Sequence, residues 1–251
     1  MRLFLHQLKA EQRIFWRNRE SAVFIFIFPV MLFLLLGSLY DGGIEVDGRE
    51  FPAADVLLAG MIGYGAANTG FAGVAIVLVV RREYAILKRL RSTPLPAPVY
   101  IGAMLASTLI VFALQVVTLF ALGRLLYDTA LPERLGSLAL LAAFGAAAFA
   151  GMGFAAASLI RSAEGASAVV NVILLPMAFL SGAFGGRDYP AVLEAIANVL
   201  PLRYFIDLVL AVYLEDEGIW SNPAALAVVA TWGVAGALVG ARYFRWEPQA
   251  R

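Results

Sequence analysis

Long apolar runs separated by short polar segments dominate the chain. They fall near residues 21–40, 54–80, 100–123, 137–160, 167–184 and 222–241. Most are close to the 20 or so residues that a helix needs to cross a bilayer. They lack the short alternating segments of an outer-membrane barrel, and a helix satisfies its own backbone polar groups inside lipid. The pattern predicts an all-α integral membrane protein, with one transmembrane domain over 1–251 and six transmembrane helices.

Basic residues divide unevenly between the two sides that this topology defines. The intervals 1–20, 81–99, 161–166 and 242–251 hold 14 of the 19 Lys and Arg residues. Because Lys and Arg favour the cytoplasmic side, both termini are predicted to lie in the cytoplasm and the protein in the plasma membrane. The first 20 residues lack the pattern of a cleaved signal peptide, so we expect the N-terminus to be retained.

The segments 1–20 and 185–221 do not fit the simple picture of spans and loops. In the first, Phe4, Leu5, Leu8 and Phe15 recur near helical spacing among basic residues, which predicts a helix on the inner leaflet. A soluble cap on the first span is the alternative. The second is apolar but interrupted by Pro201, and each half is too short to cross, so two short re-entrant helices are predicted. Two additional spans are the alternative.

The stretch RREYAILKRLRSTPLPAP, residues 81–98, is the most polar run between two apolar ones. Within 82–91 the apolar residues fall at helical intervals among basic ones, which predicts a short amphipathic helix. The residue before a proline avoids the helical region, so the helix should end near Ser92 or Thr93, ahead of Pro94. A basic loop that only fixes topology is the alternative.

Three motifs of the chain resemble the type-2 ATP-binding-cassette (ABC) transporter permease family. REYAILKRLRSTPLP is similar to its "[R/K]E-x-G-T-x-[K/R]-x-L-R-x-[T/S]-P" coupling helix, and FWRNRE to the end of its N-terminal elbow helix. FLSGAFGGRDYPAVLEAIANVLPLRYFIDLVLAVYL resembles its outer segment. The chain departs from the family at Ala85 and Ile86, where many relatives have Gly and Thr, and at 185–188, where many have an apolar or proline-rich run.

The resemblance implies a permease that works with a separate ATPase. No G-x-x-x-x-G-K-[ST] phosphate loop occurs, so ATP and Mg would be used by two copies of an ABC ATPase subunit, with two permease chains paired as a homodimer. This chain itself would bind no cofactor and no nucleic acid, and would contact only those subunits and membrane lipid. The residues implied in ATPase coupling, within a coupling helix over 81–93, are Arg82, Glu83, Tyr84, Leu87, Lys88, Leu90, Arg91, Thr93 and Pro94.

Candidate residues for a substrate pathway lie in the second and fifth spans. Tyr64, Asn68 and Phe71 recur at i, i+4 and i+7 and share one helix face. Asn171 and Met177 lie in the fifth span on either side of a proline. Amides in a membrane normally face protein or a cavity, so helix packing is the alternative to a pathway role.

The pathway candidates favour an amphiphilic drug-like or lipid-like cargo over a polysaccharide or glycolipid. The predicted function is the permease subunit of an ATP-driven exporter. A membrane-embedded enzyme and an assembly anchor are the other classes considered. The chain has one histidine and no cysteine, so neither a metal site nor a catalytic site of its own is expected.

Overall fold

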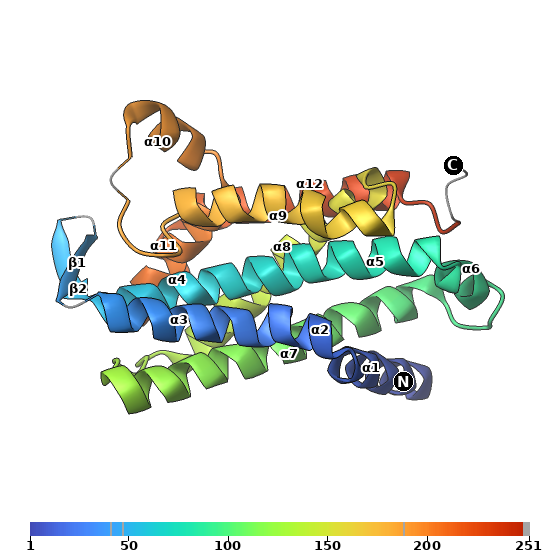
Figure 1. Cartoon of the computed structure of the whole chain (residues 1–251), viewed down its shortest axis with the longest axis horizontal. Helices are drawn as coiled ribbons and strands as arrows, with labels where there is room; N and C mark the ends of the chain where they lie inside the picture. Colours follow the sequence, from blue (N-terminus) through green and yellow to red (C-terminus); the bar gives the residue numbers. More distant parts are fainter. Residues whose placement is uncertain (41, 47, 188, 248–251) are drawn as a thin grey trace.

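The computed structural model describes residues 1–40, 42–46, 48–187 and 189–247. The chain forms an elongated helical bundle (Figure 1), in which a small hairpin lies at one end and α6 lies with both termini at the other. These ends are called the hairpin end and the α6 end below. Some residues used in the sequence analysis lie outside the described residues: Asp188 in the departure at 185–188, and 248–251 in the interval 242–251.

Helices make up most of the described chain. They are α1 (Arg2–Arg17), α2 (Arg19–Ala22), η1 (Val23–Ile27), α3 (Phe28–Leu39), α4 (Ala53–Ala67), η2 (Asn68–Gly73), α5 (Val74–Glu83), α6 (Ile86–Arg91), α7 (Ala97–Tyr127), α8 (Leu135–Leu159), α9 (Ala163–Leu180), α10 (Ala191–Ala197), α11 (Pro201–Leu214) and α12 (Pro223–Tyr243). The two η segments are π-helical, and each continues directly into the α-helices on either side. The predicted fold class, a helical multi-pass membrane protein, is therefore confirmed.

Among the described residues, five helical segments are long and apolar enough to span a membrane: the continuous helix Ala53–Glu83, α7, α8, α9 and α12. They correspond to the second to sixth expected spans. The first expected span contains the shorter apolar helix Val23–Leu39. α10 and α11 meet at a bend of 79°, as a broken span or a re-entrant loop does. The two short helices predicted between 185 and 221 are thus present, while the count of six spans stays a prediction.

A small β-hairpin in the described chain lies outside the all-α expectation. Strands β1 (Gly43–Val46) and β2 (Arg49–Pro52) form an antiparallel hairpin in the predicted loop after the first span, with Ile44 opposite Phe51. Gly48 in its turn has a φ of +78°, a conformation that favours glycine. Sequence reasoning missed it because two four-residue strands carry little periodicity.

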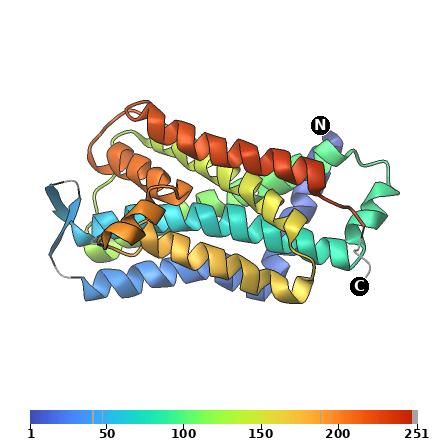
Figure 2. The same ribbon diagram turned by 90° about the horizontal axis from the view of Figure 1, so that it is seen from above.

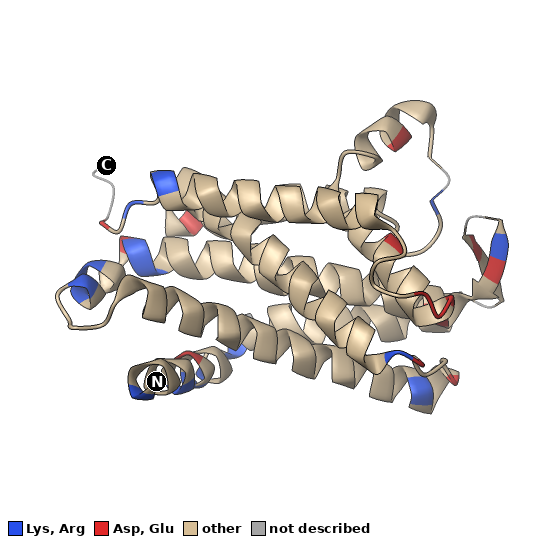
Figure 3. Cartoon of the chain, turned by 180° about the vertical axis from the view of Figure 1, so that it is seen from behind, with Lys and Arg blue, Asp and Glu red and all other residues tan. Residues whose placement is uncertain are grey.

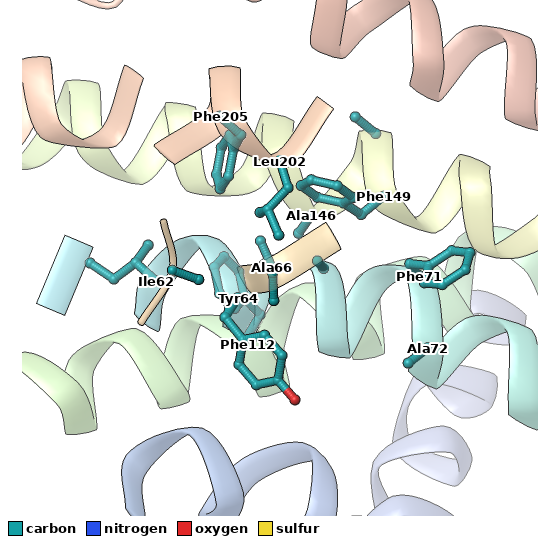
Figure 4. Packing of buried hydrophobic residues seen from close by; sticks show 14 of the residues in the cluster. Ile62, Tyr64, Ala66, Phe71, Ala72, Phe112, Ala146, Phe149, Leu202 and Phe205 are labelled. Carbon is teal, nitrogen blue, oxygen red and sulfur yellow. The ribbon is translucent and has the colours of Figure 1, made fainter. Parts of the chain in front are cut away.

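The helix Ala53–Glu83 runs through the centre of the bundle, and 89% of its apolar window is buried. Figure 2 shows it enclosed by the other long helices, and Figure 4 shows the aromatic side chains packed around it, with Phe149 and Phe205 edge to face. The glycines at 145, 151 and 153 in α8 let other elements approach closely, since a methyl group there would collide with Phe205, the Gly233 carbonyl and the Phe71 carbonyl. These glycines therefore serve close helix packing.

Charged residues gather towards the two ends of the bundle, and the middle of the described chain is drawn almost free of them (Figure 3). At the hairpin end, the buried Asp55 carboxylate accepts hydrogen bonds from the Tyr213 hydroxyl at 2.7 Å and the Ala130 amide at 2.9 Å. Arg49 and Glu215 form an exposed ion pair at 2.7 Å between the hairpin and the end of α11. The bundle therefore has two polar ends, as a membrane-spanning domain requires.

Candidate functional site

The polar stretch selected from the sequence forms a tight corner rather than one helix. The long central helix continues to Glu83, the chain turns at Tyr84 and Ala85, and α6 begins at Ile86. Ala85 has a φ of +54°, a left-handed conformation that is costly for a residue with a Cβ. The predicted single helix over 82–91 is therefore corrected to two helices joined by this turn.

The end of α6 agrees with the prediction. Its last helical residue is Arg91, followed by Ser92. The Thr93 hydroxyl donates a hydrogen bond to the Leu90 carbonyl at 2.6 Å and so satisfies one of the last free acceptors of the helix. The chain then reaches α7 through Pro94 and Pro96, whose fixed φ angles stiffen the connection.

Arg81, at the end of the central helix, joins three elements. Its guanidinium makes a bidentate ion pair with Glu11 of α1, at 2.8 and 2.6 Å, and also donates to the Tyr100 hydroxyl of α7 at 2.7 Å. The pair is almost fully buried, and Gln7 donates a further hydrogen bond to Glu11 at 2.8 Å. We call Glu11, Arg81 and Tyr100 the clamp. A bidentate geometry fixes orientation as well as distance, so the clamp holds α1 to the base of α5.

Arg82 and Glu83 attach the same corner to the loop between α8 and α9. The Arg82 guanidinium, 1% exposed, donates to the Ala157 carbonyl at 2.8 Å and to the Ile160 carbonyl. Glu83 accepts a hydrogen bond from the Ala163 amide at the start of α9. These contacts satisfy free backbone groups at the end of one helix and the start of the next, and they complement the partial charges there.

The C-terminal segment also packs at this end. The Phe244 ring lies 6.0 Å from the Arg82 guanidinium, and Trp246 lies 6.3 Å from the Tyr100 ring. The corner that precedes α6 is thus held by α1, α7, the α8–α9 loop and the end of the chain. Hydrogen bonds join it to the first three of these, and aromatic contacts join it to the last.

The coupling residues selected from the sequence divide into two groups. Arg82 and Leu87 are buried within the chain, and Glu83 is engaged with α9, so these three hold the corner together. The others are exposed or partly exposed: Tyr84, Lys88, Leu90, Arg91, Thr93 and Pro94. With Ile86 and Arg89, also exposed, they form a surface that we call the α6 face.

Four of the five pathway candidates are buried in the single chain: Tyr64, Asn68, Phe71 and Met177. The Asn68 amide donates to the Phe24 carbonyl at 3.1 Å and reaches the Ile25 carbonyl at 3.5 Å. In Figure 4, Tyr64 and Phe71 lie among other buried side chains. This arrangement favours the packing interpretation for these four residues in the conformation described.

Asn171 differs from the other four because its side chain is exposed on α9. Its neighbours on that helix include the exposed apolar residues Val172, Ile173 and Phe179. An amide on the apolar face of a membrane-spanning helix needs a partner that lipid tails do not supply.

Sequence reasoning missed a second buried amide. Gln115, near the middle of α7, is fully buried and donates to the Ile25 carbonyl at 3.2 Å and the Phe26 carbonyl at 3.4 Å. Together with Asn68 it binds carbonyls of the π-helical η1. A lone amide in the third apolar run was the signal that could have identified it. The clamp residues Glu11 and Arg81 carried no comparable signal, since 70 residues separate them.

Comparison with known proteins agrees with this fold. The sequence model of the family described as ABC-2 type transporter matches residues 2–214. The chain belongs to the ABC-2 type transporter family. A curated relative in Bacillus subtilis (strain 168), named "Putative transport permease YvfS", is 24% identical over 207 residues, which cover 82% of this chain and 83% of that protein.

Membership makes the chain a transport permease of the ABC-2 type and a multi-pass membrane protein. The match extends from α1 to the end of α11 and so includes the clamp, the α6 face and the bent α10–α11 pair. The elements described at both ends of the bundle therefore belong to one family-sized unit.

Proposed function

We propose that the chain is the permease subunit of an ATP-driven exporter and that the α6 face binds a separate ABC ATPase subunit. The observation that supports this most is the construction of the α6 end. The exposed α6 face carries Lys88, Arg89 and Arg91, while the corner behind it is held by the clamp and by Arg82 and Glu83. An exposed basic surface on a firmly held corner is suited to receive a force from outside the chain.

In this mechanism the ATPase subunits use ATP and Mg, and their closure displaces α6. Since Arg81 and Arg82 join the corner to α1, α7 and α8, the displacement passes to several helices at once. The helices then shift between an inward-facing and an outward-facing arrangement. The termini and α6 lie in the cytoplasm in this proposal, and the hairpin end lies outside.

The proposed assembly contains two permease chains and two ATPase subunits. We place the permease contact on the exposed face of α9, because a second copy supplies the partner that Asn171 lacks in lipid. Cargo would pass along this seam. The apolar and aromatic character of the α9 face, with Ile173 and Phe179 exposed, supports an amphiphilic drug-like or lipid-like cargo moved out of the cytoplasm or the inner leaflet.

The coupling proposal is tested by charge reversal on the α6 face. The chain is purified from its native membrane with the ATPase that copurifies, and ATP hydrolysis and ATP-driven efflux are measured in vesicles. Lys88→Glu with Arg91→Glu should reduce both binding of the ATPase and efflux, whereas Arg13→Glu, an exposed change on α1, should leave both unchanged. Full binding and full efflux in the α6 variant would exclude this face as the ATPase contact.

The topology and the dimer have separate tests. The sequence has no cysteine, so an introduced cysteine is the only thiol that can be labelled or oxidised. Glu45→Cys, on the hairpin, should react with a membrane-impermeant maleimide only from the outside, and labelling only from the cytoplasm would contradict the topology. Asn171→Cys should form a disulfide-linked dimer on mild oxidation. Leu238→Cys on the exposed face of α12 is the matched control and should not.

A further inference from the structure

A polar cavity at the hairpin end contains donors that the chain itself does not use. The cavity has a volume of about 420 Å³, within the range of small-molecule sites. Its roof is the hairpin, its wall is the loop 182–187, and its floor is the face of α11 that carries Arg203, Ile206 and Leu210.

Two guanidinium groups line the cavity, and each has a spare donor. Arg187 is paired with Asp207, and Arg203 lies 3.7 Å from Glu194. Yet Arg187 Nη2 and Arg203 Nη1 are buried without a hydrogen-bond partner among the described residues. A buried guanidinium N–H without an acceptor is unfavourable, so an oxyanion that accepts from both would be stabilised.

The charges of Arg187 and Arg203 both act on the hydroxyl group of Tyr189. Burial raises the pKa of the Tyr189 hydroxyl above its ordinary value, and the positive charges of Arg187 and Arg203 partly offset that rise. Arg187 is also held in place by its loop. Gly182, with a φ of +76°, packs directly against the Arg187 side chain, and a methyl group at this glycine would collide with it.

The charges of the cavity do not suit a simple anion. Glu45 of the hairpin and Glu194 of α10 line the cavity as well, and both are exposed at its edge. With Arg187 already neutralised by Asp207, a highly charged anion would meet repulsion from these carboxylates. A group with one negative charge and a nearby ammonium fits better, because the carboxylates can accept hydrogen bonds from the ammonium.

An apolar groove lies beside the polar cavity. α10 contributes Glu194 to the cavity. Other residues of α10, together with Val199 and Leu200 beyond its end, border a groove of about 700 Å³ with Trp232 of α12. The groove residues include Ala191, Val192, Ala195, Ile196, Val199 and Trp232. α10 thus borders a polar cavity on one side and an apolar groove on the other. These suit the polar headgroup and the apolar chains of an amphiphile.

We propose that this cavity binds a phosphodiester headgroup that carries an ammonium, with the acyl chains of the lipid along the α10 groove. Arg187 Nη2 and Arg203 Nη1 donate to the phosphate oxygens, and Glu45 accepts from the ammonium. The site requires only that the chain lies in a membrane and does not depend on transport or on the ATPase. Phosphatidylethanolamine is the bilayer lipid with this chemistry, and free phosphoethanolamine is the soluble source.

The test uses the full-length chain purified in detergent and stripped of lipid. Native mass spectrometry measures the dissociation constants of phosphatidylethanolamine, phosphatidylglycerol and diacylglycerol, and added O-phosphoethanolamine provides the soluble arm. We expect phosphatidylethanolamine to bind most tightly. Arg203→Lys keeps the charge but loses the spare donor and should weaken this binding about tenfold. The matched control is Arg134→Lys, an exposed arginine at the same end that is paired with Asp216.

A second variant keeps the proposal testable if Arg203→Lys fails to fold. Glu45 is exposed on the hairpin, so Glu45→Gln should leave the fold intact and remove the preference for phosphatidylethanolamine over phosphatidylglycerol. Binding of O-phosphoethanolamine without the lipid would support the headgroup chemistry and assign the soluble source. The proposal is overturned if diacylglycerol binds as tightly as phosphatidylethanolamine, or if Arg203→Lys and Glu45→Gln both bind like the unmodified chain.

Discussion

The α6 end of the bundle and the exposed edge of the hairpin end use charge in different ways. At the α6 end, Arg81 and Arg82 are buried, and their hydrogen bonds are directed to specific groups of other elements. At the hairpin end, the ion pairs of Arg49 with Glu215 and of Arg134 with Asp216 are largely exposed. Buried pairs fix geometry and are costly to break singly, whereas exposed pairs contribute little. The comparison indicates that buried, directed contacts hold the α6 end together as one unit.

The largest effect that this comparison predicts follows from breaking the clamp. Glu11→Ala leaves the buried Arg81 charge without its carboxylate and should lower the free energy of unfolding by about 3 to 5 kcal/mol. Denaturant unfolding in detergent measures it. The double variant Glu11→Met with Arg81→Met removes both charges and should recover most of the loss. Similar instability of the single and double variants would show that the clamp acts through packing alone.

The next effect concerns Arg82. Arg82→Met keeps much of the side-chain volume but leaves the Ala157 and Ile160 carbonyls without this donor, and it should cost about 2 to 3 kcal/mol. The matched control is Arg89→Met, an exposed arginine of α6 that should change stability by less than about 0.5 kcal/mol. Equal stability of the two variants would contradict the bracing role assigned to Arg82.

A smaller effect of opposite sign is expected at the turn before α6. Ala85→Gly relieves the left-handed conformation and should stabilise the chain by about 1 kcal/mol. The thermal unfolding midpoint should rise accordingly. A lower midpoint would mean that the Ala85 methyl group contributes more to packing than its backbone strain costs.

The smallest effect belongs to the hairpin end. Asp216 has a φ of +52°, a conformation that Asn tolerates better than Ala. Asp216→Asn removes the charge that pairs with Arg134 and should lower the free energy of unfolding by less than about 1 kcal/mol, with the difference declining as salt is added. Unfolding curves at low and high ionic strength measure it. A loss as large as that of Glu11→Ala would remove the contrast between the two ends.

Much of the fold was predictable because hydropathy and proline chemistry act locally. Five of the expected spans, the two short helices around Pro201 and the end of α6 near Ser92 were read from neighbouring residues. The break at Ala85 was not, because a helical pattern of Tyr84, Leu87 and Leu90 continues through it. Only the structure shows that the chain turns there.

The candidate site was predictable in part for a related reason. Its position after the second span was identified, but the division of its residues into buried and exposed groups depends on packing against distant segments. The sequence pattern predicts that Arg82 and Glu83 are surface charges, whereas the structure shows both bonded to the end of α8 and the start of α9. Gln115 and the clamp depend on contacts between segments that no local pattern connects.

The most direct test of the coupling claim compares one position at each end. Lys88→Cys on the α6 face and Glu217→Cys at the hairpin end are labelled separately with a maleimide in detergent, with and without the copurifying ATPase. Both positions are exposed in the isolated chain. We predict that the ATPase slows labelling of Lys88→Cys at least tenfold and leaves Glu217→Cys unchanged. Unchanged labelling of Lys88→Cys in the presence of bound ATPase would contradict the account.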